Sequence, residues 1–279
     1  MREVHVNDIT NTVAKLCIKA CIEVSCDIRA FMERARPTED GLGGLVFDQM
    51  LANQDIARAD RLPICQDTGM AVVFVTMGQD VRVLGGGLAE AIHAGVRKGY
   101  DEGFLRKSVV GDPLNRVNTG DNSPAIIHYD IMEGDAFHIT VSPKGFGSEN
   151  MSRLKMLVPA DGVEGIKNFV LETINMAHSN ACPPMVVGIG IGGNFELSAI
   201  MAKKALLRHL GQPHPDPAWA KLEGELLEAI NKTNIGPAGL GGRTTAMAVH
   251  INSYATHIAG LPIAVNLGCH VNRHEEASL

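Results

Sequence analysis

Apolar residues recur at spacings of three and four over residues 8–35, which predicts one long amphipathic helix with Asp8 as its N-cap. Pro37 marks the end of this helix, because proline cannot continue the hydrogen-bond ladder. The same periodicity predicts further helices over 44–58, 88–100, 163–178, 195–210 and 219–230. We therefore expect a helical N-terminal part, to about residue 60.

Short apolar runs bounded by Pro, Gly or polar residues predict strands between these helices. Residues 125–131 and 136–141 flank Glu133-Gly134-Asp135, a turn sequence typical of a hairpin, so these two runs are expected to pair with each other. Other strands are expected over 70–75, 185–189, 245–251 and 261–265. The elements together indicate a mixed α/β (α+β) fold, in which the helical part is followed by mixed sheets. Residues 1–279 are expected to form one domain, or two lobes with the helical part over about 1–60.

Glycine is abundant, with 30 residues that gather in several short clusters. Such clusters mark tight turns and close approach of backbones, which suits Gly-rich loops that converge on a site lined by main chain. The polar segment 104–122 shows no periodicity and is long for a structureless connection. It is compatible with a binding loop and equally with a solvated surface loop.

Composition narrows the class of protein. The chain has 45% hydrophobic residues, 20% charged residues and a net charge of -6, without the basic stripe that nucleic-acid binding requires. No apolar run is long enough to span a bilayer, and the first residues lack the apolar segment of a signal peptide. We therefore expect a cytoplasmic protein with no membrane and no nucleic-acid partner, in which the six cysteines are thiols, metal ligands or core residues and not disulfides.

Three of the cysteines, Cys65, Cys182 and Cys269, lie in Gly- or Pro-containing loops next to predicted strands. They are far apart in sequence and include no C-x-x-C pair, which argues against zinc. Two interpretations remain open from spacing alone: three buried loop cysteines, or three thiolates that hold an iron–sulfur cube. In such a cube an iron without a protein ligand can act as a Lewis acid on a substrate hydroxyl. The other three cysteines, Cys17, Cys21 and Cys26, are expected to be core or helix-contact residues and not a metal pair.

Four polar residues are candidates for work on an anionic substrate. Asp67, two residues after Cys65, is a candidate acid/base, or a residue that activates one. Gln66 can hydrogen-bond a carboxylate, and Arg106 offers the bidentate fork that dicarboxylates favour. His257 is a candidate proton shuttle, although a lone histidine is more often a core or surface residue.

Gly188, Gly190 and Gly193 form a G-x-G-x-x-G pattern between a predicted strand and a predicted helix, which is the dinucleotide-binding fingerprint. The acidic residue expected about 20 residues later, at the end of the next strand, is absent, because residues 209–215 break a strand. The helix that begins near 193–195 could still present main-chain N–H groups to an anion.

Five stretches in order along the chain carry a resemblance to a known family. They are Pro63-Ile64-Cys65-Gln66-Asp67-Thr68-Gly69, Asn118-Thr119-Gly120-Asp121-Asn122, Cys182-Pro183-Pro184 with the following 188–196, Gly239-Leu240-Gly241-Gly242-Arg243-Thr244-Thr245, and Asn266-Leu267-Gly268-Cys269-His270. With them the chain resembles the iron–sulfur class I fumarases and the closely similar L-tartrate dehydratases, in particular the alpha subunit of the two-subunit form.

The resemblance implies a [4Fe–4S] cluster held by Cys65, Cys182 and Cys269, whose fourth iron binds the hydroxyl and one carboxylate of malate. It implies that Gln66, Asp67, Arg106 and the main chain near Gly147 line the pocket, and that His257 carries a proton. The family's remaining basic residues come from a second domain, so the resemblance also implies a beta subunit, in a heterotetramer, that completes the site for a small dicarboxylate.

The activity implied is reversible hydration of fumarate to L-malate, with L-tartrate dehydration as the alternative. Two readings of other classes stay open. One is a nicotinamide-dependent oxidoreductase that uses Gly188–Gly193, and the other is a cluster-bearing subunit without catalytic activity.

Overall fold

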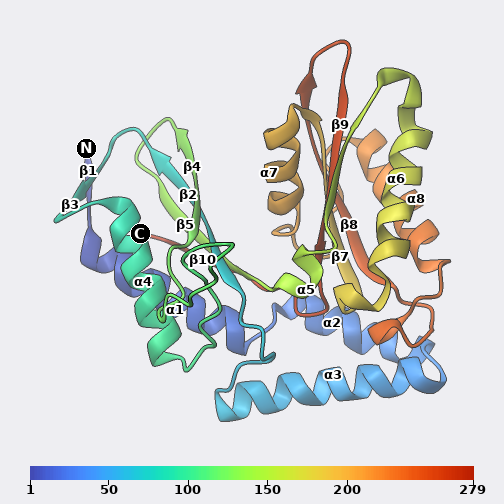
Figure 1. Cartoon of the computed structure of the whole chain (residues 1–279), viewed down its shortest axis with the longest axis horizontal. Helices are drawn as coiled ribbons and strands as arrows, with labels where there is room; N and C mark the ends of the chain where they lie inside the picture. Colours follow the sequence, from blue (N-terminus) through green and yellow to red (C-terminus); the bar gives the residue numbers. More distant parts are fainter. The chain divides into compact units, whose positions relative to one another are not determined.

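The computed structural model describes residues 1–279, which divide into two compact units. Unit 1 comprises Met1–Val24, Gln54–Phe146 and Arg273–Leu279. Unit 2 comprises Ser25–Asn53 and Gly147–Asn272. Figure 1 shows helices and strands in both units, so the α+β fold with an N-terminal helical part is confirmed.

The elements follow one another in an irregular alternation of helix and strand. The helices are α1 (Val6–Ile22), α2 (Cys26–Ala35), α3 (Gly41–Asp60), α4 (Leu88–Glu102), α5 (Phe146–Glu149), α6 (Gly162–Ala177), α7 (Phe195–Ala205) and α8 (Pro217–Asn231). The strands are β1 (Arg2–His5), β2 (Met70–Gly78), β3 (Val81–Leu84), β4 (Ile126–Met132), β5 (Phe137–Lys144), β6 (Arg153–Leu157), β7 (Met185–Gly193), β8 (Ala246–Thr256), β9 (Leu261–Gly268) and β10 (Glu275–Ser278). Short 3-10 turns lie at Arg36–Thr38, Pro159–Asp161, His178–Ala181 and Pro237–Gly239.

The single helix expected over 8–35 is wrong, because the chain breaks it into α1 and α2. Glu23 adopts an extended conformation, and Ser25 stands as the N-cap residue of α2. The apolar period continues through the break, so periodicity alone does not reveal it. The N-cap of α1 is His5 and not Asp8, since the His5 Nδ1 accepts from the Asn7 N–H at 3.2 Å.

Unit 1 is built on a four-stranded sheet in the order β10-β5-β2-β4, with α1 and α4 packed together on it. Two glycines of α4 let the helices approach closely. A Cβ at Gly95 would lie 2.7 Å from the Thr10 carbonyl oxygen, and one at Gly99 would lie 2.8 Å from that of Ala14. This close packing buries the aliphatic residues of α1 and α4 against β2 and β5.

The hairpin expected from Glu133-Gly134-Asp135 does not form. Strands β4 and β5 both pair with β2, β4 in parallel and β5 antiparallel, so β2 lies between them. The turn crosses the end of β2 and is fixed there, because the Asp80 N–H donates to the Gly134 carbonyl at 3.0 Å. The sequence predicts the turn, but the pairing of the two strands that flank it depends on β2, about 50 residues earlier in the chain.

Unit 2 contains a second four-stranded sheet in the order β6-β9-β7-β8. Helices α6 and α8 cover one face and α7 covers the other (Figure 1). The aliphatic residues of β7, β8 and β9 that face α6 and α8 form the main core of the unit. On the opposite face Gly188 and Gly190 lie inside β7, where a Cβ would fall 2.2 Å from the Ala202 carbonyl and 2.0 Å from that of Ser198, respectively. These glycines therefore allow α7 to pack closely on β7. In a dinucleotide-binding fold the glycines lie instead in the turn between the strand and the helix, where they bind phosphate.

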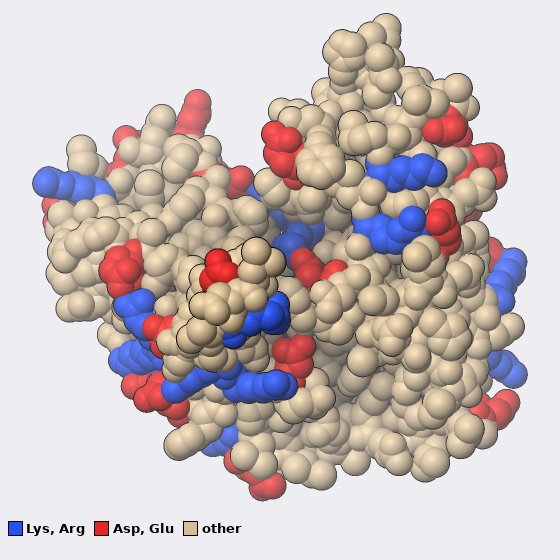
Figure 2. Space-filling model, viewed as in Figure 1, with Lys and Arg blue, Asp and Glu red and all other residues tan.

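Charged side chains of both signs are spread over the face drawn in Figure 2. No helix of the structure has the length and apolar character that a membrane span needs.

Candidate active site

Two cysteine loops meet at one end of the unit 2 sheet. Cys182 precedes β7 and Cys269 follows β9, and the two strands are antiparallel with Val186 opposite Gly268. Antiparallel pairing brings the start of one strand beside the end of the other, so both thiols lie at the same edge. The loops are also hydrogen-bonded, since the His270 N–H donates to the Cys182 carbonyl oxygen at 3.0 Å.

The Cys182 loop is held by a Gly-rich neighbour. Cys182 has left-handed backbone geometry (φ 52°) and ends the 3-10 turn His178–Ala181. The carbonyl oxygen of the next residue, Pro183, accepts a hydrogen bond from the Ala238 N–H at 2.9 Å. At Gly239 (φ +77°) a Cβ would lie 2.4 Å from the Cβ of Ser179, so only glycine fits there. The motif 239–245 therefore supports the Cys182 loop by direct packing.

A buried carboxylate in turn fixes the motif 239–245. Glu39 is 2% exposed, and its carboxylate accepts from the main-chain N–H groups of Arg243 and Thr244 at 2.6–3.0 Å. A buried carboxylate satisfied by backbone donors is a strong, geometrically specific contact. Sequence reasoning missed Glu39, which lies about 200 residues away in a segment without a recognisable motif.

The Cys269 loop is held by a polar network from α5, α7 and β9. Asn266 donates its amide to Glu149 Oε2 at 2.9 Å and to Ser152 Oγ at 3.0 Å. Glu149 pairs with Lys203 on α7, 2.6 Å between Oε1 and Nζ. The Leu267 N–H donates to the same Ser152 hydroxyl at 3.1 Å. These contacts fix the strand end from which Cys269 projects.

Gly147 lies beside the Cys182 loop. It belongs to the short helix α5, is exposed, and a Cβ there would stand 3.3 Å from the Asn180 carbonyl oxygen. Its main chain is thus placed within unit 2 next to the loop that carries one of the two thiols.

The third loop, Cys65–Gly69, belongs to unit 1 and is clamped by two buried side chains. The Tyr100 hydroxyl donates to the carbonyl oxygens of Thr68 and Gly69 at 2.7 and 3.1 Å. The Asn122 amide donates to the Gly69 carbonyl at 3.2 Å. Burial raises the pKa of Tyr100 well above its usual value, so the phenol remains a donor. The motif residue Asn122 therefore supports this loop.

Asp67 is held as a hydrogen-bond acceptor beside Cys65. Its Oδ1 accepts from the Gly69 N–H at 3.0 Å and its Oδ2 from the Phe146 N–H at 2.8 Å. Its own N–H points at Cys65 Sγ, 3.4 Å away. The buried Arg273 donates to the Asp67 carbonyl. The aspartate is thus fixed in place by main-chain donors, with its backbone in contact with the thiol.

Gln66 and Arg106 are exposed near the same loop. The Cys65 thiol lies 3.5 Å from Gln66 Oε1. The Arg106 carbonyl accepts from Thr68 Oγ1 at 2.9 Å, which anchors this residue beside the loop while its guanidinium remains exposed. Unit 1 therefore brings Cys65, Gln66, Asp67 and Arg106 together at one place.

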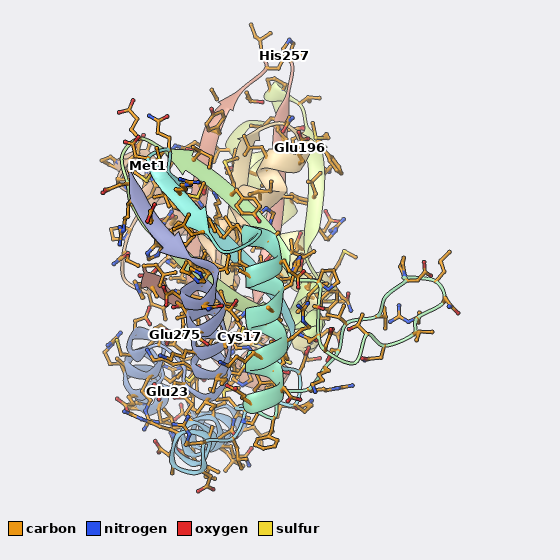
Figure 3. The ribbon with its side chains drawn as sticks, turned by 90° about the vertical axis from the view of Figure 1, so that its left-hand side faces the viewer. Met1, Cys17, Glu23, Glu196, His257 and Glu275 are labelled. Carbon is orange, nitrogen blue, oxygen red and sulfur yellow. The ribbon has the colours of Figure 1, made fainter.

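His257 is not brought to the thiols of unit 2. It follows β8, and β8 runs parallel to β7, so His257 lies near Gly193 at the opposite end of the sheet from Cys182. Figure 3 shows it at the tip of the connection between β8 and β9. β8 is 11 residues long, and a strand rises about 3.3 Å per residue, which separates His257 from Cys182 by roughly 30 Å. Sequence reasoning alone could not detect this separation.

The remaining cysteines differ in environment from the three loop thiols. Cys17 and Cys21 are fully buried on α1, as expected, and burial raises the pKa of both thiols, to about 11 for Cys21. A thiol with a pKa this high stays protonated and is a poor metal ligand. Cys26 was expected to be packed, but it is exposed at the start of α2. Within either unit no group of three or more His, Cys, Asp or Glu side chains is gathered at metal-binding distances.

Comparison with known proteins extends over nearly the whole chain. The family model described as fumarate hydratase (fumerase) matches residues 10–278. A putative L(+)-tartrate dehydratase subunit alpha of Methanocaldococcus jannaschii is 43% identical over 274 residues, which cover 95% of each chain. An L(+)-tartrate dehydratase subunit alpha of Escherichia coli is 34% identical over 273 residues, covering 96% of this chain and 89% of the relative.

Proposed function

Because the chain belongs to the fumarate hydratase family, we propose that it is the alpha subunit of an iron–sulfur hydro-lyase that removes water from a hydroxylated dicarboxylate. The observation that carries the proposal is the meeting of the Cys182 and Cys269 loops at one end of one sheet, linked by the hydrogen bond from His270. Two substrates fit: L-malate, in equilibrium with fumarate, and L-tartrate. The description of the family model favours L-malate, and the names of the relatives favour L-tartrate. The two lines of support are equally strong.

The ligands of the proposed [4Fe–4S] cluster are Cys65, Cys182 and Cys269. All three lie in loops and are at least partly exposed, unlike the buried Cys17 and Cys21, so their sulfur atoms are accessible to iron. The Asp67 N–H that points at Cys65 Sγ is the kind of donor that stabilises a cluster thiolate. When bound, the cluster supplies a Lewis-acidic iron that polarises the leaving hydroxyl.

The polar residues of unit 1 are assigned to the substrate carboxylates and to proton movement. Arg106 offers a free guanidinium for a bidentate contact, and Gln66 offers an amide donor. Asp67 has both oxygens engaged by main-chain N–H groups. We therefore assign it to orienting a proton-transferring group, or to receiving its proton, from a fixed position. Gly147 contributes its main chain on the side of unit 2.

His257 lies roughly 30 Å from Cys182 of the same chain, at the other end of β8. It can therefore carry a proton only at the active site of another copy. If it acts in the reaction, the connection between β8 and β9 of a second copy must bring it to the site. This assignment rests on the geometry of one sheet and is open to a direct test by subunit mixing.

A beta subunit is proposed to complete the pocket. The relatives are named alpha subunits. The residues assigned above include a single cation, Arg106, to neutralise two substrate carboxylates. The further basic groups would come from the beta subunit, in a heterotetramer that contains two copies of each chain.

The test is anaerobic co-purification with the beta subunit, followed by assays with L-malate, fumarate and L-tartrate. We expect a brown complex that dehydrates one of these substrates and loses activity in air. A preference for tartrate over malate selects tartrate dehydratase, and the reverse selects fumarase. A colourless protein that binds a nicotinamide dinucleotide would overturn the proposal, and a brown complex inactive on all three substrates would favour a subunit without catalytic activity.

A further inference from the structure

A cavity of about 470 Å³ lies in unit 2, between α2, α8, β8 and the loop 210–213. This volume is in the range of small-molecule sites, which are about 300–1,000 Å³. None of the residues assigned to the proposed active site lines it. It also lies apart from the β7 glycines, which pack against α7.

The floor of the cavity is the free edge of a sheet. β8 pairs with β7 on one side, and its other side has no strand neighbour. Side chains satisfy this edge at both ends. Asn231 bonds the N–H and the C=O of Ala246 at 2.9 and 3.2 Å, and Glu223 accepts from the Ile251 N–H at 2.7 Å.

Between these two points the edge is left open at Val249. Alternate residues of a strand direct both N–H and C=O to the same edge, so Val249 faces the side that Ile251 faces. Val249 is only 4% exposed and lines the cavity, and no side chain bonds its outward main-chain groups. Buried main-chain donors and acceptors are nearly always satisfied by protein, by ordered water or by a ligand, so Val249 offers one donor and one acceptor to a molecule that enters the cavity.

The walls of the cavity add an aromatic surface and a cation. Phe31 and Arg34 line it from α2, and Arg34 is exposed. Glu223, which also lines the cavity, has its carboxylate engaged by the Arg208 guanidinium and by the main-chain N–H groups of His214 and Ile251.

From these features we propose that the cavity is a nucleotide-binding site. The edge of a base would pair with the main chain of Val249, its ring would pack against Phe31, and the phosphate would meet Arg34. An added peptide strand would need a longer free edge than the single outward residue between Ala246 and Ile251. A plain anion would leave the main chain of Val249 unsatisfied. The site is independent of the proposed activity and would hold for any function of the chain.

The test is calorimetric titration of the purified complex with AMP, adenosine and ribose 5-phosphate. Saturable binding of one AMP per chain is expected, with ribose 5-phosphate at least tenfold weaker. Saturating the complex with its dicarboxylate substrate should not displace the AMP. Arg34→Gln should weaken AMP at least tenfold and leave adenosine unchanged, because the base contacts remain.

A matched pair of variants on α8 locates the binding. Gly224 lines the cavity, and a Cβ there meets no atom within 4 Å, so Gly224→Leu fills the cavity without a backbone clash. It should weaken both AMP and adenosine at least tenfold. Lys221→Leu changes the same helix at an exposed position outside the cavity and should bind as the parent does. Absence of AMP binding, equal binding by the two α8 variants, or equal affinity for ribose 5-phosphate would each overturn the proposal. If Gly224→Leu does not fold, the comparison of AMP with adenosine in Arg34→Gln decides.

Discussion

The His270 N–H donates to the Cys182 carbonyl oxygen at 3.0 Å, and His270 Nδ1 contacts the same oxygen at 3.2 Å. Residues 88 positions apart are thereby joined immediately beside two thiols. A substitution that disturbs one loop is therefore expected to affect the other. The pair also explains why Cys182 and Cys269 lie at one edge of the sheet although no short sequence motif contains both.

Replacing Cys65, Cys182 or Cys269 by Ser should abolish cluster retention, since a cube missing one of three protein ligands is held too weakly to survive purification. The measurement is visible absorption of the anaerobically purified complex. Cys26→Ser is the matched control for exposure, and Cys17→Ser is the control for a buried thiol. Both controls should stay brown, although Cys17→Ser is expected to lower the free energy of unfolding by about 1–3 kcal/mol by burying a hydroxyl. Equal loss of colour in Cys26→Ser would mean that other thiols hold the cluster.

Asp67→Asn should reduce turnover strongly, by about 10²-fold or more if Asp67 takes part in proton transfer. It should also lower the free energy of unfolding by about 1–3 kcal/mol, because an amide NH₂ would oppose the N–H of Gly69 or Phe146. Asp112→Asn is the control, as Asp112 likewise accepts two main-chain N–H groups, those of Leu114 and Asn115, in an exposed loop. Unchanged turnover in Asp67→Asn would remove Asp67 from the reaction.

Local patterns predicted most helices and strands, but they could not predict contacts between distant segments. The turn Glu133-Gly134-Asp135 was recognised, yet β2 separates the strands that flank it. The periodicity of α1 and α2 hid the break at Glu23. Of the residues first assigned to the site, His257 lies far from the cysteines of its unit because the parallel β8 carries it to the other end of the sheet. The supporting residues Glu39 and Tyr100 lie outside the recognised motifs, and their roles depend on packing.

Glu149→Gln should loosen the Cys269 loop. The change removes the charge that pairs with Lys203, in a part-buried network that also holds Asn266. We expect the free energy of unfolding to fall by about 1–3 kcal/mol, and the visible absorption to decay several-fold faster in air. Glu225→Gln is the control, because its ion pair with Lys167 lies on the surface and exposed pairs contribute little. If the visible absorption decays at the same rate in both variants, this network does not protect the cluster.

His250 should make the free energy of unfolding depend on pH. Burial, with the nearby Arg208 cation, lowers the pKa of His250 from 6.5 to about 4, against the opposite effects of Glu223, the Ala205 carbonyl and Asp27. Above pH 6.5 the folded and unfolded chains both hold it neutral; below that, only the unfolded chain takes up the proton. The free energy of unfolding should therefore fall by about 1.5 kcal/mol between pH 6.5 and 5 from this residue alone. Denaturant titration of the parent and of His250→Gln measures it, and an equal slope in both would contradict the assignment.

Subunit mixing tests whether His257 acts at a site on another copy. Complexes that carry His257→Ala or Cys182→Ser should each be inactive, the first because the proton carrier is lost and the second because the cluster is lost. When alpha chains of the two kinds are mixed equally, half of the alpha pairs hold one of each, and each such pair has one site with an intact cluster and an intact histidine from its partner copy. Activity should then return to about a quarter of the parent value. The control is a mixture of the two variant complexes made after assembly. Its alpha chains can no longer form mixed pairs, so it should stay inactive. Full activity of His257→Ala alone would remove this histidine from the reaction, and no recovery in the mixture would show that it does not serve a second copy.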